Sequence, residues 1–239
     1  MDTNSNQARR VVIGITAHVD AGKTTLAEAM LYRTGRLRKL GRVDHGSAAM
    51  DSHLLERERG ITIFSSQAEL PIGDLEVTLL DTPGHVDFSA EMERTLSVLD
   101  YAILVISGAD GVQAHTRTLW RLLELYRIPT FLFVTKMDFG RCGRGQMMEH
   151  LRHELGEGCV DFTPADRERR MEQLATCRED ALEAYLDGGE VPDALVRQLV
   201  GRRLVFPCWF GSGLKLEGID EFLEGLARYV EPPVYPETF

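Results

Sequence analysis

A lysine and two threonines follow a glycine near the amino terminus, and this spacing is suited to binding a polyphosphate. Residues 17–25 read AHVDAGKTT; they follow the apolar run 11–15 and precede the helix-forming residues 26–31. In a strand–loop–helix unit of this kind, backbone N–H groups and the positive end of the helix face the anion. Lys23 would reach the outer phosphates, and the Thr24 hydroxyl would coordinate the Mg²⁺ ion that accompanies them.

One position departs from the general phosphate-loop pattern. Ala17 stands where the first glycine usually lies, whereas Gly22 is kept at the point where the backbone comes closest to the phosphate. A chance glycine-rich turn is the alternative explanation for so short a match. The strand pattern before the loop and the helix pattern after it favour phosphate binding.

Further polar groups follow another predicted strand, at 75–80, where they could contact the same ligand. Asp81 comes first, and its carboxylate can hold Mg²⁺ through water. The N–H group of Gly84 can contact the terminal phosphate, and His85 comes directly after it. This segment has the features of a phosphate sensor.

Two later loops carry groups that can recognise guanine. Asp138 follows the predicted strand 129–134, and its carboxylate can accept both N–H groups on the Watson–Crick edge of guanine, a pair that adenine does not offer. The glycine-rich residues 211–213 follow the predicted strand 204–209, and their N–H groups can donate to the guanine oxygen that adenine lacks. Each short string is weak alone, but four of them in this order at strand ends indicate one nucleotide site.

The elements that must position these groups alternate between strand and helix. Residues 61–70 and 75–80 predict a hairpin with a turn at 71–74, and the runs 102–107 and 129–134 are typical of buried parallel strands. Helical patterns cover residues 88–99, 116–126 and 219–229. The predicted fold is therefore α/β, a doubly wound, mostly parallel sheet with helices on both faces.

A polar, arginine-rich stretch at about 141–203 interrupts this alternation and predicts a helical insertion. Its helical segments are expected at 147–155, 167–187 and 192–200. The last predicted helix stops before Pro232 and Pro233. We therefore expect one domain over residues 1–231 and, at 232–239, the start of a linker to further domains.

Composition restricts the class of protein. Of the 239 residues, 44% are hydrophobic, which is sufficient for a core. The net charge of −10 argues against wholesale nucleic-acid binding, and no sequence-specific nucleic-acid partner is expected. No apolar run is long enough for a membrane span and no signal peptide is recognisable, so a cytoplasmic location without a membrane partner is expected. The four cysteines are widely spaced and are expected to be reduced. Five basic residues between Arg33 and Arg42 could face phosphate, but a solvated surface is the commoner explanation.

These motifs resemble those of the translational GTPases, closest to elongation factor G and the ribosomal-protection tetracycline-resistance proteins. The resemblance runs almost from end to end and weakens between residues 141 and 203. Residues 54–63 and 110–116 look more like the protection proteins than like the elongation factor. The matching segments are residues 17–25, 54–63, 81–87 and 97–100.

The resemblance implies a role for individual residues. His85 matches the histidine that positions the attacking water when the ribosome pushes it inward, with Val19 and Ile61 as the apolar pair beside it. Thr62 matches a threonine that binds Mg²⁺ only with GTP, whereas His18 has no matching role and is expected to pack locally. The nucleotide-binding matches are Asp20, Ala21, Gly22, Lys23, Thr24, Thr25, Gly84, Thr135, Lys136, Asp138, Gly211, Ser212 and Gly213, and the metal-binding matches are Thr24, Thr62 and Asp81.

Two positions depart from the family pattern, which has asparagine where Thr135 stands and alanine where Gly213 stands. Thr135 keeps a hydroxyl but lacks the amide, so we expect it to replace only part of the bonding between this loop and the phosphate loop. Gly213 keeps its backbone N–H. His150 and His153 lie one helical turn apart without an evident third ligand, so an exposed helix face is favoured over a metal site.

The resemblance implies a Mg²⁺-dependent, ribosome-activated GTPase that converts GTP to GDP and phosphate, in the tetracycline-resistance class. An elongation factor G-type translocase domain and a guanine-nucleotide-binding module without hydrolysis are the alternatives. An ATPase is a further rival, against which Asp138 argues. The ribosome is the expected partner, and the isolated domain is expected to be monomeric.

Overall fold

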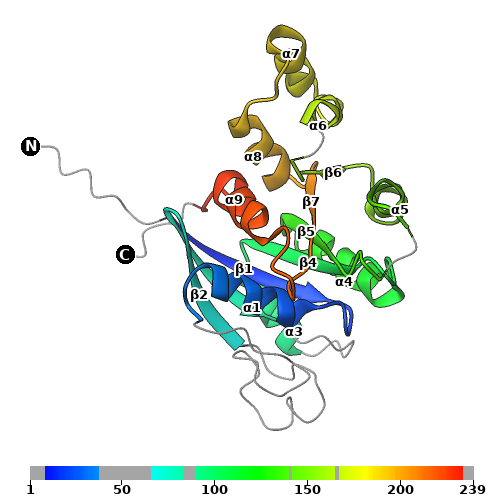
Figure 1. Ribbon diagram of the computed structural model, residues 1–239. Coiled ribbons are helices and arrows are strands. Elements are labelled where there is room, and N and C mark those ends of the chain that lie inside the picture. Colours follow the sequence, from blue (N-terminus) through cyan, green and yellow to red (C-terminus); the bar gives the residue numbers. More distant parts are fainter. Residues whose placement is uncertain (1–8, 38–65, 83–89, 140–141, 165–166, 234–239) are drawn as a thin grey trace, which may run out of the picture.

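The computed structural model describes residues 9–37, 66–82, 90–139, 142–164 and 167–233 (Figure 1). In these ranges the strands form one seven-stranded sheet in the order β2-β3-β1-β4-β5-β7-β6. Every neighbouring pair is parallel except β2 and β3. The strands are β1 Arg9–Ala17, β2 Ser66–Ile72, β3 Leu75–Asp81, β4 Tyr101–Ser107, β5 Thr130–Thr135, β6 Cys159–Asp161 and β7 Phe206–Phe210.

Strands β2 and β3 form the expected hairpin, with a tighter turn than the sequence predicts. Pro71 and Ile72 pair with Glu76 and Leu75, so only residues 73–74 connect the strands. Pro71 is tolerated because β2 is an edge strand, where the missing N–H breaks no ladder on the outer side. The predicted strand residues 61–65 lie outside the described part of the chain.

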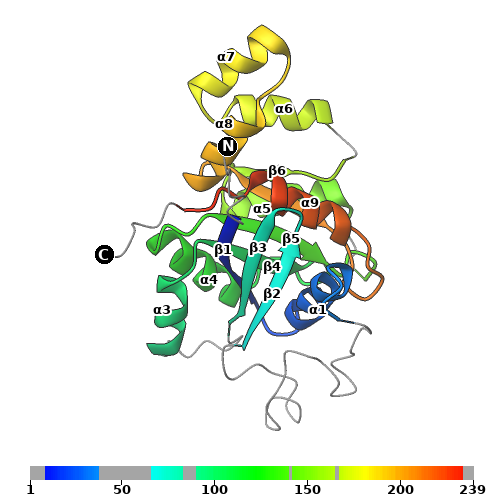
Figure 2. The ribbon, with the colours of Figure 1, turned by 90° about the vertical axis from the view of Figure 1, so that its left-hand side faces the viewer.

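Helices cover both faces of the sheet, which confirms the predicted doubly wound class (Figure 2). Helices α1 (Lys23–Arg33) and α9 (Ile219–Tyr229) pack over one apolar cluster. Helices α3 (Ala90–Ser97), α4 (Ala114–Leu125) and α5 (Arg144–Leu155) cover the other face through a second cluster. All residues of β4 and β5 are buried between these layers, as their continuous apolar runs predict.

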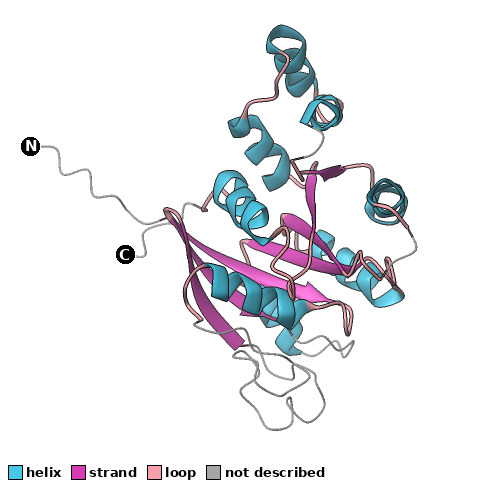
Figure 3. Cartoon of the chain, viewed as in Figure 1, coloured by secondary structure: helices cyan, strands magenta, loops and turns pink. Residues whose placement is uncertain are grey.

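The stretch from 141 to 203 is largely helical, but it also belongs to the sheet (Figure 3). Helix α5 is a regular member of one helical layer, and β6 adds an edge strand parallel to β7. The additional helices extend beyond that edge, at one end of the molecule in Figures 1 and 2. They are α6 Arg167–Ala175, α7 Glu179–Gly188 and α8 Asp193–Gly201.

The single helix predicted at 167–187 is two helices. Residues 176–178 separate α6 from α7, and Arg178 has an extended backbone that starts the second helix. Leu174 and Ala181 are both fully buried in the same apolar cluster, which a turn between the helices allows. No glycine or proline marks this break, so tertiary packing and not local propensity decides it.

None of the helices within the described ranges is long and apolar enough to cross a membrane.

Candidate nucleotide-binding site

The predicted site loops follow the strands β1, β3, β5 and β7, which are parallel members of one sheet. Parallel strands end at the same edge, so the four loops lie at one edge of the sheet. Hydrogen bonds and close contacts between the loops, described below, join them into one site.

The phosphate loop connects β1 to α1 through a left-handed glycine. Gly22 has φ 95°, a conformation that side chains rarely adopt, and its carbonyl accepts the N–H of Leu26 in the first helical turn. The first turn of α1 contains no acidic residue, so its positive end is not neutralised locally. Thr24 and Thr25 are half-buried on this turn. The helix end therefore has the charge and the open N–H groups that suit an anion.

Lys23 and Asp81 form a buried ion pair between the phosphate loop and the end of β3. Lys23 Nζ lies 2.5 Å from Asp81 Oδ1, and the side chains are 9% and 0% exposed. The ammonium also donates to the carbonyl oxygen of Thr82, whose own hydroxyl donates to Ile15 O at 2.9 Å. The lysine is thus already held against the loop that follows β3.

Thr135 and Lys136 tie the loop after β5 to the phosphate loop. Thr135 Oγ1 donates to Ala21 O at 2.6 Å, and Lys136 Nζ donates to Asp20 O at 2.6 Å. The Thr135 hydroxyl therefore makes a direct hydrogen bond between these two loops. Asp20 and Lys136 both have positive φ, at 60° and 55°, so the two linked loops adopt a conformation that costs free energy in non-glycine residues.

Replacing Thr135 with valine should weaken GDP binding about fivefold. The substitution keeps the shape but removes the hydroxyl bond to the Ala21 carbonyl, a loss of about 1 kcal/mol that loosens the phosphate loop. Calorimetric titration with GDP measures this. Thr130→Val is the matched control, because Thr130 is also buried in β5 and donates to Ile128 O at 2.9 Å, away from the site loops. Equal loss of GDP affinity in both variants would assign the effect to general destabilisation.

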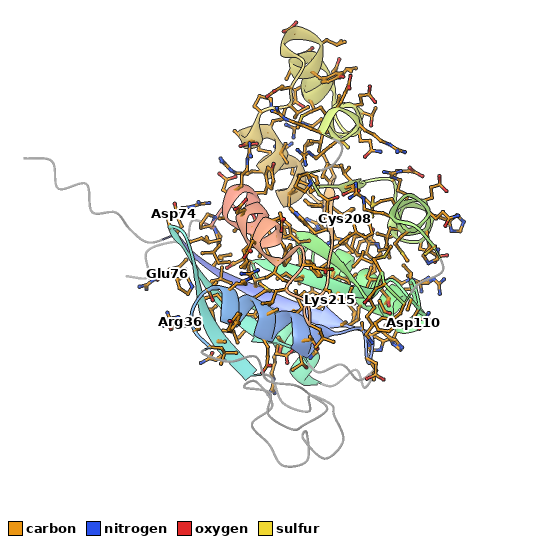
Figure 4. The ribbon with its side chains drawn as sticks, viewed as in Figure 1. Arg36, Asp74, Glu76, Asp110, Cys208 and Lys215 are labelled. Atoms are coloured by element: carbon orange, nitrogen blue, oxygen red, sulfur yellow. The ribbon has the colours of Figure 1, made fainter. Side chains whose placement is uncertain are left out.

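Lys215 is a site residue that sequence reasoning missed. It lies in the loop between β7 and α9 (Figure 4), and its ammonium is 2.7 Å from Asp138 Oδ2. The hydrogen bond from Lys215 lowers the pKa of Asp138, and the same bond raises the pKa of Lys215. The carboxylate that would recognise guanine is thereby oriented before a ligand binds. A lysine shortly after residues 211–213 was the available signal, but its partner is 77 residues away in the chain.

Lys215→Met should reduce GDP affinity about two- to fivefold, the range typical of an exposed ion pair. Discrimination against ADP should remain, because Asp138 itself is unchanged. The pKa of Asp138 should rise in the variant, so GDP binding should be lost at a higher pH as the solution is acidified. GDP titrations across a pH series measure this, with Lys215→Arg as the control that keeps the charge. If the parent and both variants lost GDP binding at the same acidic pH, Lys215 would not orient the Asp138 carboxylate.

The loop after β7 packs directly on the start of α1 at Gly213. A Cβ at Gly213 would lie 2.9 Å from the Thr25 carbonyl oxygen, closer than real Cβ contacts allow. Ser212 is held by paired backbone bonds with Glu217, at 2.9 and 3.0 Å. The loop is therefore rigid and close to the phosphate loop, so an alanine would require movement of the α1 backbone.

Four of the residues predicted for the site lie outside the described part of the chain. They are Thr62, Gly84 and His85, together with Ile61, the proposed neighbour of His85. Val19, the other proposed neighbour, is half-buried in the phosphate loop.

The histidines in the described part of the chain differ in their contacts. His18 contacts the ring of His115 at a centroid distance of 5.7 Å, in line with the local packing expected for it. His150 Nε2 accepts the N–H of Val112 at 3.1 Å, so it is not simply a residue of an exposed helix face, whereas His153 is exposed. Within the described ranges, no cluster of three His, Cys, Asp or Glu residues could hold a metal ion.

The early basic stretch is ion-paired where the structure describes it, and the cysteines are reduced. Arg33 pairs with Asp220 at 3.1 Å and Arg36 with Glu69 at 3.7 Å, which favours a solvated, ion-paired surface over a phosphate site for these two residues. The other three basic residues lie outside the described ranges. All four cysteines are free thiols. Burial raises the pKa of the Cys208 thiol, which lies in β7 (Figure 4).

The parallel sheet, its covering helices and the four linked loops define a P-loop GTP-binding domain. Residues 8–232 match the family model described as the elongation factor Tu GTP binding domain. The chain therefore belongs to that family and is a GTPase domain of the translation-factor class.

Similar proteins agree with this assignment. The oxytetracycline resistance protein of Streptomyces rimosus is 41% identical, over 93% of this chain and 37% of that protein. Tetracycline resistance protein TetM of Streptomyces lividans is 39% identical, over 96% of this chain and 39% of that protein. A crystal structure of a Thermus thermophilus protein matches with a TM-score of 0.84 at 28% identity, over 94% of this chain and 41% of the other. The chain thus spans about two fifths of the curated relatives it matches.

Proposed function

We propose that this chain is the ribosome-activated GTPase domain of a tetracycline-resistance protein that acts on the ribosome. The proposal rests on the hydrogen bonds that Lys23, Thr135 and Lys136 form between the phosphate loop and the loops after β3 and β5. Loops joined in this way would hold the phosphates and the guanine of one nucleotide at the same time. The identity of 35–41% to several tetracycline resistance proteins supports the resistance class.

The donors at the phosphate end fit Mg²⁺, because a fully buried carboxylate at Asp81 and a threonine hydroxyl at Thr24 are oxygen ligands of the kind that this ion prefers. When bound, Mg²⁺ neutralises charge on the phosphates. The α1 amides and the Lys23 ammonium would orient the phosphate chain and stabilise the charge that develops on it. Catalysis in this design is positional and electrostatic.

Asp138 would accept the two N–H groups of guanine, while the backbone at Ser212 and Gly213 would donate to its oxygen. Thr62 would join the Mg²⁺ shell only when GTP is bound, so the segment before it would act as a switch. His85 would orient the attacking water after the ribosome moves it inward. Without that movement, hydrolysis should be slow.

The extent of the domain and its setting are part of the same proposal. Residues 1–231 would form the GTPase domain and residues 232–239 the start of a linker to the domains by which the full protein contacts the ribosome. The isolated domain would be monomeric, and the protein would act in the cytoplasm. An elongation factor G-type translocase is the second candidate, favoured by the translation-factor family match.

Single-turnover GTP hydrolysis by the full-length protein tests the proposal. Ribosomes should stimulate the rate strongly, and His85→Ala should reduce the stimulated rate about 10²-fold or more, which is the range for loss of a general acid or base. GDP affinity should be nearly unchanged in the variant. The measurement compares rapid-quench rates with and without ribosomes.

A fast rate without ribosomes, equal to the stimulated rate, would contradict ribosome activation. Unchanged turnover in His85→Ala would remove this residue from the reaction. Release of tetracycline from stalled ribosomes by the full-length protein separates the resistance class from a translocase, which would move tRNA instead.

A further inference from the structure

A second pocket that can receive an anion lies between α5, β6 and α6, apart from the nucleotide loops. Its volume is about 160 Å³, and its lining includes Arg144, Arg152, Arg169, Arg170, Gly145 and Asp161. None of its lining residues belongs to the four loops of the nucleotide site. Strand β6 is the edge of the sheet opposite to β2. We call this cavity the arginine pocket.

Within the described lining, Asp161 carries the only carboxylate, and that carboxylate is already engaged. Asp161 Oδ2 pairs with Arg144 Nε at 2.8 Å, and Asp161 Oδ1 accepts the N–H of Thr163 at 2.9 Å. Its one negative charge therefore offsets Arg144. Arg152 and Arg170 therefore keep positive charge in the pocket, although the chain as a whole carries a net charge of −10.

Two of the arginines are held in place by neutral groups. Arg152 Nε donates to Cys159 O at 3.1 Å, and Arg170 Nη1 donates to Phe162 O at 3.1 Å. Carbonyl oxygens orient these guanidinium groups without neutralising them. The guanidinium of Arg170 also lies over the Phe162 ring, 5.4 Å from its centroid.

Arg170 adds an independent indication of a missing acceptor. Its Nε is buried and has no hydrogen-bond partner among the described residues. Buried donors of this kind are nearly always paired in proteins, so this N–H indicates an acceptor that the described residues do not supply.

The first turn of α5 forms part of the wall, through Arg144 and Gly145. This helix of 12 residues has no acidic residue in its first turn, so its positive end is not neutralised there. A Cβ at Gly145 would meet no atom of the described residues within 4 Å, so these residues leave space at this turn. An anion can approach the helix backbone closely here.

We propose that the arginine pocket binds a phosphate group. A phosphate group offers two or three free oxygens and one or two negative charges, which several guanidinium groups can bind at once. Guanidinium groups bind phosphate through paired N–H donors, which requires the fixed orientation that Arg152 and Arg170 have. The phosphate can be inorganic or part of a small molecule, or it can belong to an RNA backbone, and the test separates these sources.

The experiment measures binding of inorganic phosphate by calorimetry and of a short labelled RNA duplex by fluorescence anisotropy, with excess GDP present to fill the phosphate loop. The pocket variant is Arg152→Gln with Arg170→Gln. We expect it to bind at least about tenfold more weakly, and the slope of RNA affinity against salt should fall by about one unit for each phosphate that the variant no longer neutralises. The matched control is Arg121→Gln with Arg202→Gln, two exposed arginines outside the pocket, which changes the net charge by the same amount.

Gly145→Asp is a second variant that separates binding from folding. An aspartate in the first turn of α5 replaces a glycine and complements the helix dipole, so the unfolding midpoint should be unchanged or higher. Its carboxylate would compete with phosphate for the arginines, so phosphate binding should still fall at least about tenfold.

If both pocket variants weaken RNA binding and the control does not, the source of the phosphate is an RNA backbone. Binding of inorganic phosphate alone, with the same pattern, identifies a small phosphorylated ligand. Either result supports the proposal. Equal weakening in the control, or no binding of either probe by the parent protein, would overturn it.

Discussion

Lys23→Met should abolish useful GTP binding and also destabilise the protein in the absence of nucleotide. The variant keeps the length of the side chain but leaves the fully buried Asp81 carboxylate without its cation. Removing one partner of a buried ion pair typically costs about 3–5 kcal/mol, far more than the pair contributes. Loss of the ammonium from the phosphates should weaken GTP by about 10³-fold, which is of the order expected for a desolvated charge contact. Denaturant unfolding and GDP or GTP titration measure the two effects.

A double variant separates the two effects of Lys23. Lys23→Met with Asp81→Asn removes both buried charges, so most of the lost stability should return while nucleotide binding stays lost. Lys215→Met is the matched control for the same substitution in an exposed pair, and its stability should be close to that of the parent. If Lys23→Met alone unfolds at the same denaturant concentration as the parent, the buried pair does not exist in solution.

Asp138→Asn should change the base preference from guanine to xanthine. The carboxylate accepts two N–H groups of guanine, whereas an asparagine amide offers one acceptor and one donor, which suits the xanthine edge because xanthine has an acceptor where guanine has an amino group. Sites built to hydrogen-bond a particular group reject the wrong analogue by about 10⁴-fold or more. Titration with GDP, XDP and ADP on the parent and the variant measures the change.

Two outcomes would count against this assignment of Asp138. Binding of ADP as tightly as GDP by the parent domain would return the ATPase interpretation. Weakening of GDP without any gain for XDP would mean that the Asp138→Asn substitution only disrupts the loop, for example by losing the ion pair with Lys215. Lys215→Met loses that ion pair while keeping the carboxylate, so comparing the two variants distinguishes these explanations.

The family match extends over nearly the whole chain. Much of it rests on local patterns that can be recognised in the sequence alone. The phosphate loop needs a glycine, a lysine and a hydroxyl at fixed spacing, and residues 22–24 satisfy this within three positions. The runs at 102–107 and 129–134 are apolar throughout because their strands are buried on both faces. The helix at 219–229 is observed at the predicted bounds, because its apolar spacing and the prolines after it are both local signals.

Other features have no comparable local signal. Strand β6 has only three residues, too few for a recognisable alternation, and exists because β7 offers it a partner. The break between α6 and α7 has no glycine or proline, and burial on both sides of it decides where the chain turns. The residues of the arginine pocket come from α5, β6 and α6, so no single stretch of the sequence contains the pocket.

By itself, the sequence of this protein determined the alternation of elements, the order of the four site loops and the chemical groups that each loop carries. Only the tertiary structure decided which of those groups meet. Thr135 reaches the Ala21 carbonyl across 114 residues, and Lys215 reaches Asp138 across 77. The physical reason is that strand and helix patterns depend on neighbours along the chain, whereas these contacts depend on the order of strands in the sheet, which brings the ends of β1, β5 and β7 to one edge.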